Sequence, residues 1–324
     1  MSELVQENLT TLSNHLRVDR QLGPLADVIE AIALATKSIA AKIRRARIDA
    51  VIGTVGSVNV QGEVQEKLDL ISDELVLHCM RHCPPVAVYG SEEQEHPVVL
   101  RRRSEGGQFA VLSDPLDGSS NIDVAVSVGT IFSVLPNNQE DATTANAVLQ
   151  PGRNQVASGY VLYGSSVLLV LATASGVDLY VLDPSLGEFV LVKAGVTMPT
   201  EKKIYSINEA YWNDFSDGLR DYLEFAHAAG YGARYIGSMV ADVHRTLLKG
   251  GVFIYPATDK SPKGKLRLMY EGNPMAYVME QAGGAGSAGA GRIMDVEPEA
   301  LHERTPVICG SSGEVEQVTS RLAG

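Results

Sequence analysis

Apolar side chains recur with a helical period in two early parts of the chain. Proline in a first turn and arginines in a last turn suit a helix that begins at Pro24 and ends near Arg47. Its apolar stripe consists of Leu25, Val28, Ile29, Ile32, Ile39 and Ile43. A second stripe from Leu68 to Cys79 predicts another helix, which Pro84 stops. Residues 1–22 lack such a period, and we expect an arm that packs on a neighbour or on the domain surface.

Short apolar runs bounded by turn residues predict strands along the first two hundred or so residues. They cover Val86–Tyr89, Phe109–Leu112, Val124–Leu135, Ser158–Tyr163, Val167–Thr173 and Val177–Leu182. Around Pro199 the pattern changes to alternating helices and strands. There we expect a helix over 239–249, a strand over 252–255, and a helix over 273–281 that Asn273 caps. The change predicts an N-terminal domain of residues 1–199 and a C-terminal domain of residues 200–324.

The charge balance limits what the chain can bind. With 27 basic and 39 acidic residues the formal net charge is -12, and a nucleic acid partner would need a basic face. No apolar stretch approaches the roughly twenty residues that cross a bilayer. No basic segment followed by an apolar one opens the chain. We therefore expect a cytoplasmic protein without nucleic acid or membrane partners.

The cysteines predict no disulfide framework. There are three, Cys79, Cys83 and Cys309, so reduced thiols are the expectation. A zinc site that combines Cys79 and Cys83 with His78 and His82 is the alternative for this helix end.

The segment from Val111 to Asp123 carries the clearest chemical signal. It reads Val-Leu-Ser-Asp-Pro-Leu-Asp-Gly-Ser-Ser-Asn-Ile-Asp. We expect Pro115 to cut the preceding strand short, so that Asp114 and Asp117 leave its end on a tight turn. Two carboxylates buried together would repel each other, and a divalent metal ion would relieve this. Residues 118–121 are small and polar, as in loops whose backbone N–H groups bind an anion. An ordinary turn rich in Asp and Asn is the alternative.

Further carboxylates stand at positions that suit chemistry. Glu92 and Glu93 follow the strand over 86–89, at the edge of a sheet where catalytic side chains gather. Asp69 lies off the apolar stripe of its helix. The acidic side chains named so far would offer oxygen ligands to a metal ion. Oxygen ligands suit magnesium or manganese rather than zinc. A solvated loop is the alternative for the Glu92–Glu93 pair.

The run from Val111 to Asp123 resembles the metal and phosphate signature of the lithium-sensitive sugar phosphatase superfamily. Its ending Ser-Ser-Asn-Ile-Asp is similar to that of class I fructose-1,6-bisphosphatase. The resemblance continues through Lys67-Leu68-Asp69, Ser91-Glu92-Glu93, Gln150-Pro151-Gly152-Arg153-Asn154, Tyr205-Ser206-Ile207-Asn208-Glu209, residues 231–246, Gly264-Lys265-Leu266-Arg267 and residues 271–277. It implies an α+β (mixed α/β) protein with the layered αβαβα sugar-phosphatase fold and two subdomains.

The resemblance also implies an activity. A metal-activated water would hydrolyse the 1-phosphate of fructose 1,6-bisphosphate, in gluconeogenesis or the reductive pentose phosphate cycle, with Mg²⁺ as cofactor and Mn²⁺ as a substitute. Sedoheptulose 1,7-bisphosphate is a second expected substrate, because the two sugars share the reacting end. The segment from Val51 to Gly62, rich in small residues, is expected to be a mobile loop that closes over the metals.

Individual roles follow from the resemblance alone. Metal ligands would be Glu92, Asp114, Leu116, Asp117 and Glu271, and Asp69 and Glu93 would position and deprotonate the attacking water. The reacting phosphate would rest on Gly118, Ser119 and Ser120, with Asp117 beside it. The second phosphate would be bound by Asn208, Tyr211, Tyr235, Tyr255 and Lys265. Arg234 would reach the site of an adjacent subunit, in the homotetramer that is typical of the family.

Two other functions compete with this one. An enzyme of the same superfamily acting on inositol monophosphate or a nucleotide would not need the second phosphate site. A regulatory homologue without turnover would lack a metal ligand, whereas every acidic position of the pattern is present.

We expect weak or absent inhibition by AMP. Animal members bind AMP through a threonine-rich helix start, a Lys-Tyr pair and an arginine. The corresponding places hold Leu22, Ala26, Gln108, Phe109 and Pro136, which lack phosphate-binding groups. Steady-state phosphate release across micromolar AMP checks this. Micromolar inhibition that is abolished by substitutions next to Ala26 would overturn it. Residues 137–147 contain no cysteine, so thioredoxin control of the chloroplast type is not expected either.

Overall fold

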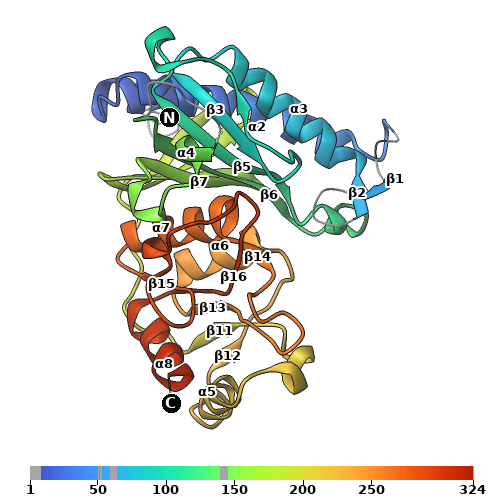
Figure 1. The fold of residues 1–324 in the computed structure, drawn as a ribbon, viewed down its shortest axis with the longest axis vertical. Helices are drawn as coiled ribbons and strands as arrows, with labels where there is room; N and C mark the ends of the chain where they lie inside the picture. The colour runs from blue at the N-terminus through green and yellow to red at the C-terminus, as the bar shows by residue number, and fades with distance from the viewer. Residues whose placement is uncertain (1–8, 50, 52, 59–63, 139–144, 324) are drawn as a thin grey trace, which may run out of the picture.

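A large and a small β-sheet organise the chain (Figure 1). The computed structural model describes residues 9–49, 51, 53–58, 64–138 and 145–323. Within these, the large sheet runs in spatial order through β10 (Glu188–Lys193), β9 (Gly176–Asp183), β8 (Val167–Thr173), β7 (Ala157–Tyr163), β6 (Val128–Pro136), β5 (Phe109–Asp117), β3 (Val86–Ser91) and β4 (Val98–Val99). Neighbouring strands are antiparallel except β3 and β5, which are parallel. The carboxyl ends of β3 and β5 therefore meet at one edge of the sheet.

The smaller sheet lies in the second half of the chain. Its spatial order is β12 (Gly232–Ala233), β11 (Ile204–Ser206), β13 (Val252–Tyr255), β17 (Val307–Gly310) and β15 (Ala285–Ser287). Two antiparallel pairs stand apart from both sheets, β1 (Thr54–Val58) with β2 (Val64–Glu66) and β14 (Leu266–Arg267) with β16 (Arg304–Thr305).

Helices form layers on and between the sheets, as Figure 1 shows. On the outer face of the large sheet lie α2 (Pro24–Arg45) and α3 (Lys67–Arg81). Between the two sheets lie α6 (Met239–Lys249) and α7 (Asn273–Gln281), and beyond the smaller sheet lie α5 (Asp217–Ala228) and α8 (Ser312–Leu322). The short helix α1 (Leu12–Asn14) contacts α2 and β10, and the short helix α4 (Ala145–Val148) contacts β3, β5 and β6. This order confirms the predicted αβαβα layering and the mixed α/β class.

The predicted apolar stripe of α2 is buried. Val28, Ile32 and Ile39 of α2 are each at most 2% exposed. Each such side chain contributes about 1.5–3 kcal/mol through the hydrophobic effect. The described part of the N-terminal arm packs on the domain surface as expected. There His15 Nδ1 lies 2.6 Å from the Tyr180 hydroxyl, and Arg20 forms an ion pair of 2.7 Å with Asp178.

The strand before the acidic motif was predicted too short. β5 continues through Pro115 to Asp117, and its register against β6 shifts between Asp114 and Asp117. Such a bulge accommodates proline, which has no N–H to donate. The hydroxyl of Thr130 donates to the Pro115 carbonyl at 2.8 Å. The turn therefore comes at Gly118, whose φ of 76° lies in the left-handed region that glycine favours.

Other boundaries also differ from the sequence prediction. Residues 119–124 form a 3₁₀-helix, so β6 begins at Val128 rather than at position 124. Strand β10 was not predicted. Part of the expected mobile loop over 51–62 pairs as strand β1, while residues 52 and 59–62 lie outside the described residues.

Asn273 does not cap α7. A π-helical turn, η6 (Leu268–Gly272), runs directly into the helix, and Gly272 already has helical backbone angles. The helical backbone therefore starts before Asn273.

The predicted domain boundary at residues 199 and 200 falls between β10 and β11, and the division remains a prediction.

Among the described residues, none of the helices has both the length and the apolar character needed to span a bilayer.

Candidate active site

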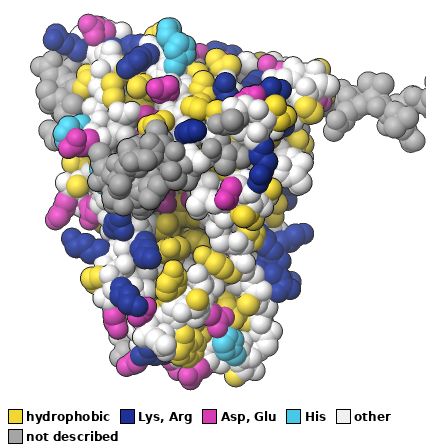
Figure 2. Space-filling view, turned by 90° about the vertical axis from the view of Figure 1, so that its right-hand side faces the viewer, with side chains coloured by type: hydrophobic (Ala, Val, Ile, Leu, Met, Phe, Trp, Pro, Cys, Tyr) yellow, Lys and Arg dark blue, Asp and Glu magenta, His cyan; other side chains and the backbone are white. Residues whose placement is uncertain are grey.

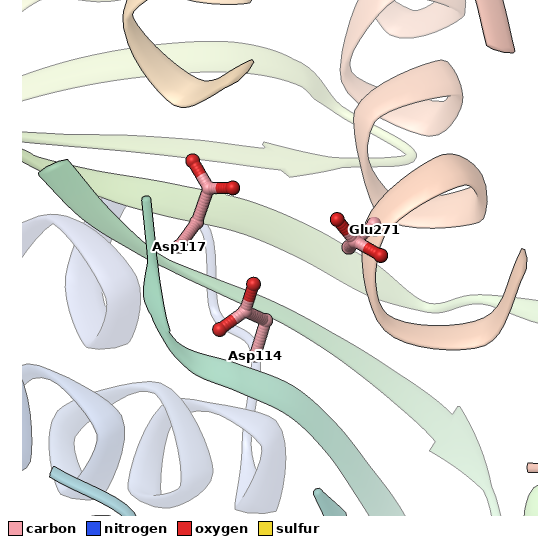
Figure 3. Close-up of side chains that lie close together, drawn as sticks. All are labelled: Asp114, Asp117 and Glu271. Atoms are coloured by element: carbon pink, nitrogen blue, oxygen red, sulfur yellow. The ribbon is translucent and has the colours of Figure 1, made fainter. Parts of the chain in front are cut away.

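Three carboxylates from distant parts of the chain meet between the large sheet and the turn before α7, as Figure 3 shows. Asp114 and Asp117 extend from the end of β5, and Glu271 extends from η6. One oxygen atom from each side chain lies within 4.8 Å of the others. The three residues are between 3% and 8% exposed. The sequence prediction placed these residues in one site, and the structure brings them together.

Each carboxylate is oriented by a backbone N–H group. Leu116 N donates to Asp114 Oδ1 at 3.0 Å, and Arg267 N donates to Glu271 Oε2 at 2.6 Å. Val240 N, in the first turn of α6, donates to Asp117 Oδ2 at 3.1 Å. Asp117 therefore also benefits from the positive end of the α6 helix dipole.

Glu92 completes the acidic cluster. Its Oε1 lies 3.2 Å from a guanidinium nitrogen of Arg267, and both side chains are largely buried. The Glu92 N–H donates to the Ser113 carbonyl at 3.2 Å, so Glu92 lies next to the end of β5 from which Asp114 extends. Arg267 thus lies beside the carboxylates. Leu116, whose carbonyl was predicted as a fifth ligand, lies between the two aspartates on β5 and is 5% exposed.

Burial and repulsion from neighbouring carboxylates raise the pKa of all three residues and so favour their protonated forms. Burial, followed by the charges of Glu92, Asp117 and Glu271, raises the pKa of Asp114 well above its usual range. Burial and Glu92 likewise raise the pKa of Glu271, and Arg267 opposes them. Burial raises the pKa of Asp117 to about 6, against the Val240 N–H hydrogen bond. A divalent cation would replace these protons, and four carboxylates together form the oxygen donor set that hard cations prefer.

No second group of this kind occurs in the part of the chain that the structure describes. The zinc alternative at His78, Cys79, His82 and Cys83 therefore receives no support from the geometry. His82 Nδ1 instead lies 2.8 Å from the His78 carbonyl, and Cys83 is buried.

The two predicted catalytic acids lie on elements that border the cluster. Asp69, 7% exposed, stands in the first turn of α3, which packs on β3 and β5. Glu93 follows β3, and its backbone N–H donates to Ser91 Oγ at 3.2 Å. Asp69 thus lies on a helix that packs on the two strands leading to the cluster, and Glu93 lies next to Glu92 in the chain.

The predicted phosphate-binding turn directly follows Asp117. Gly118 opens the 3₁₀-helix that contains Ser119 and Ser120. Asn121 Nδ2 donates to the Gly237 carbonyl at 3.1 Å, which ties this turn to the loop before α6. The turn is thereby held between the carboxylates at the end of β5 and the loop before α6.

A separate pocket contains most of the predicted second-phosphate residues. Asn208, Tyr211, Tyr255 and Lys265 line it, and Lys265 Nζ lies 5.3 Å from the centre of the Tyr211 ring. Burial and the Asp242 charge raise the pKa of Tyr235, and its hydrogen bond with the Asn208 side chain opposes them. Tyr235 thus joins this group.

Arg234 does not line the pocket of its own chain and is exposed.

Although the net charge is -12, Figure 2 shows Lys and Arg side chains gathered along both edges of the lower half of one face.

The sequence analysis missed a buried aspartate that shapes this region. Asp242 of α6 accepts hydrogen bonds from Ser206 Oγ at 2.7 Å, from Ile236 N at 2.9 Å and from Gly237 N at 3.0 Å. It therefore fixes the loop that carries Tyr235. The available signal was an acidic residue between Ala241 and Val243, within the apolar side of the predicted helix.

Comparison with known proteins covers almost the whole chain. A family model described as the N-terminal domain of fructose-1-6-bisphosphatase matches residues 9–194, and the model of its C-terminal domain matches residues 198–323. Fructose-1,6-bisphosphatase isozyme 2 of Bos taurus is 44% identical over 321 residues, which cover 96% of this chain and 94% of the relative. The class 1 fructose-1,6-bisphosphatase of Chlorobium luteolum is 44% identical over 324 residues, with 98% and 97% covered.

A solved structure shares the fold. The holo form of Leishmania major fructose-1,6-bisphosphatase superposes with a TM-score of 0.93 at 38% identity, covering 98% of this chain and all of that one.

The raised pKa of Asp117 predicts how metal-free protein responds to pH. The folded state holds this proton more tightly than the unfolded state, whose carboxyl titrates near 3.8. The resulting stabilisation is present below about pH 4 and is lost as pH rises through about 6. In EDTA, we expect Asp117→Asn to exceed wild type in free energy of unfolding above pH 6, by up to about 3 kcal/mol. Urea denaturation at pH 4 to 8 measures this.

Saturating Mg²⁺ provides the control for that experiment. Mg²⁺ should raise the free energy of unfolding of the wild type and leave that of Asp117→Asn nearly unchanged. If the difference in free energy of unfolding between wild type and Asp117→Asn varies neither with pH nor with Mg²⁺, the raised pKa of Asp117 does not explain it.

Proposed function

The chain belongs to the fructose-1,6-bisphosphatase family, and we propose that its buried carboxylates bind the divalent metal ions used in this reaction. The enzyme hydrolyses the 1-phosphate of fructose 1,6-bisphosphate and releases fructose 6-phosphate and inorganic phosphate. The observation that supports the site is the convergence of Asp114, Asp117 and Glu271 next to the turn at Gly118. A cation site and an anion site side by side are what phosphoryl transfer requires.

Magnesium is the proposed cofactor, with manganese as a substitute. Glu92, Asp114, Asp117, Glu271 and the Leu116 carbonyl would supply its oxygen ligands. Bound there, divalent ions acidify a water molecule and neutralise charge on the phosphoryl oxygens. The repulsion among the carboxylates supports this assignment, because a cation converts it into attraction.

We assign the remaining roles, orienting the water and binding the reacting phosphate, to side chains and backbone N–H groups of the protein. Asp69 and Glu93 would orient the attacking water and accept its proton, since Asp69 begins a helix that packs on β3 and β5 and Glu93 directly follows Glu92. The backbone N–H groups of Gly118, Ser119 and Ser120 would donate to the oxygens of the reacting phosphate.

The second phosphate would bind in the pocket of Asn208, Tyr211, Tyr235, Tyr255 and Lys265. Hydroxyl, amide and ammonium donors suit a phosphate dianion, and a monophosphate substrate would not need them. Sedoheptulose 1,7-bisphosphate offers the same two charged ends and is the proposed second substrate.

We also propose that the active enzyme is a homotetramer. Arg234 is exposed and lies outside its own pocket, although its neighbour Tyr235 belongs to it. An arginine placed in this way is available to the second-phosphate pocket of an adjacent subunit. A cytoplasmic location remains a prediction from the sequence.

Removing one carboxylate should abolish turnover. We expect Asp114→Asn to lower kcat for fructose 1,6-bisphosphate by at least about 100-fold, because even groups that only orient a metal ligand contribute 10–100-fold. Asp217→Asn is the matched control, since that side chain is 98% exposed on α5. Phosphate release with and without Mg²⁺ measures both. Wild-type turnover by Asp114→Asn would refute the proposed metal site.

Removing the pocket's ammonium group should weaken binding of the bisphosphate alone. We expect Lys265→Met to raise KM for fructose 1,6-bisphosphate by about 10–100-fold, the value of a hydrogen bond to a charged group. KM for fructose 1-phosphate should stay unchanged. Lys263→Met, at an exposed position outside the pocket, is the control. Equal effects of Lys265→Met on both substrates would exclude a role for this pocket in binding the second phosphate.

A further inference from the structure

We propose that Asp73 and Gln94 are positioning residues, which hold the loop of Glu92 and Glu93 in place for the reaction. The inference rests on the proposed function of those two glutamates. The side-chain amide of Gln94 donates to Asp73 Oδ2. Asp73 is 3% exposed and stands one helical turn after Asp69 on α3. The interaction therefore links the helix of one predicted catalytic acid to the loop of the other.

The same carboxylate is tied to the strands that end at the site. The hydroxyl of Tyr89, on β3, donates to Asp73 Oδ1 at 2.9 Å and lies 2.8 Å from Ser113 Oγ. Ser113 directly precedes Asp114 on β5, and Tyr89 is completely buried. A continuous chain of hydrogen bonds thus connects α3, β3 and β5 directly behind the acidic cluster.

Gln94 is also held from the opposite side. Its backbone carbonyl lies 3.0 Å from His302 Nε2, and His302 Nδ1 lies 2.8 Å from the Tyr270 hydroxyl. A carbonyl can only accept, so Nε2 carries the proton and Nδ1 accepts from Tyr270. Tyr270 directly precedes Glu271. Both ends of Gln94 are therefore anchored, one to α3 and one to the turn that carries the last carboxylate.

The direction of the hydrogen bond between Gln94 and Asp73 can be tested by exchanging its donor and its acceptor. Both oxygens of Asp73 accept hydrogen bonds, so the group facing Oδ2 must be a donor. A glutamate at position 94 would place two carboxylates in contact in a buried region and push the loop away. An asparagine at position 73 could donate to that glutamate and restore the contact with donor and acceptor exchanged. The change Asp73→Asn alone would be tolerated, because the amide of Gln94 can rotate by half a turn and accept.

The experiment compares Gln94→Glu, Asp73→Asn and the double variant. We expect Gln94→Glu to lower kcat for fructose 1,6-bisphosphate and to weaken Mn²⁺ binding, each by about tenfold or more. KM should change by less than about twofold, because the second-phosphate pocket is not touched. Asp73→Asn, and the double variant, should remain within about threefold of wild type. Titration of free Mn²⁺ by electron paramagnetic resonance gives the binding constant without turnover.

Several controls separate the possible failures. Gln317→Glu adds the same charge at an exposed position of α8 and should match wild type. Urea denaturation shows which variants fold. Should Gln94→Glu fail to fold, Tyr89→Phe, which removes one hydroxyl, takes its place and should lower kcat and weaken Mn²⁺ binding together.

Two results would overturn the inference. One is wild-type kcat and Mn²⁺ affinity in Gln94→Glu, or in Tyr89→Phe where that variant replaces it. The other is a double variant no better than Gln94→Glu alone. Absence of phosphate release by wild type would instead count against the proposed function, so the two failures are distinguishable.

Discussion

Electrostatic repulsion among buried carboxylates is the constraint around which this structure is arranged. Asp114, Asp117 and Glu271 are almost removed from water, and Glu92 adds a fourth charge beside them. A cluster of this kind is unfavourable by itself, because desolvation and repulsion act in the same direction. Backbone N–H groups and the Arg267 guanidinium offset only part of that energy. The fold therefore stabilises an arrangement whose remaining repulsion the proposed cation would relieve.

The topology explains how four carboxylates from distant positions come together. The parallel pair β3 and β5 ends at one edge of the large sheet, where Glu92 and Asp114 emerge side by side. The bulge at Pro115 shifts the register of β5 against β6, and Asp117 follows it on the same strand. From the other layer, the π-helical turn before α7 contributes Glu271. Irregular backbone occurs at both contributing elements, and regular strand and helix geometry would not aim these side chains at one point.

Much of this could be predicted from the sequence, and the errors have physical causes. The long amphipathic helix and most central strands follow from periodicity, and the Asp114–Asp117 pair follows from its motif, whereas Glu271 joins the acidic set only through the resemblance. The strand through Pro115 was missed because proline usually ends a strand, and only a tertiary partner, Thr130, makes the exception favourable. Asp73 and Gln94 were missed for a related reason. Their contact joins residues 21 positions apart, and no local pattern marks a hydrogen bond between a helix and a loop packed in three dimensions.

Helix α6 takes part in both halves of the site. Its first turn donates to Asp117, while its Asp242 fixes the loop of Tyr235 beside the pocket for the second phosphate. One helix thus sets the spacing between the carboxylate cluster and the pocket proposed for the second phosphate. A bisphosphate with a longer carbon chain must therefore fold its own chain until its two charged ends match that spacing. The protein cannot adjust instead, because moving this helix would unpack the core between the two sheets.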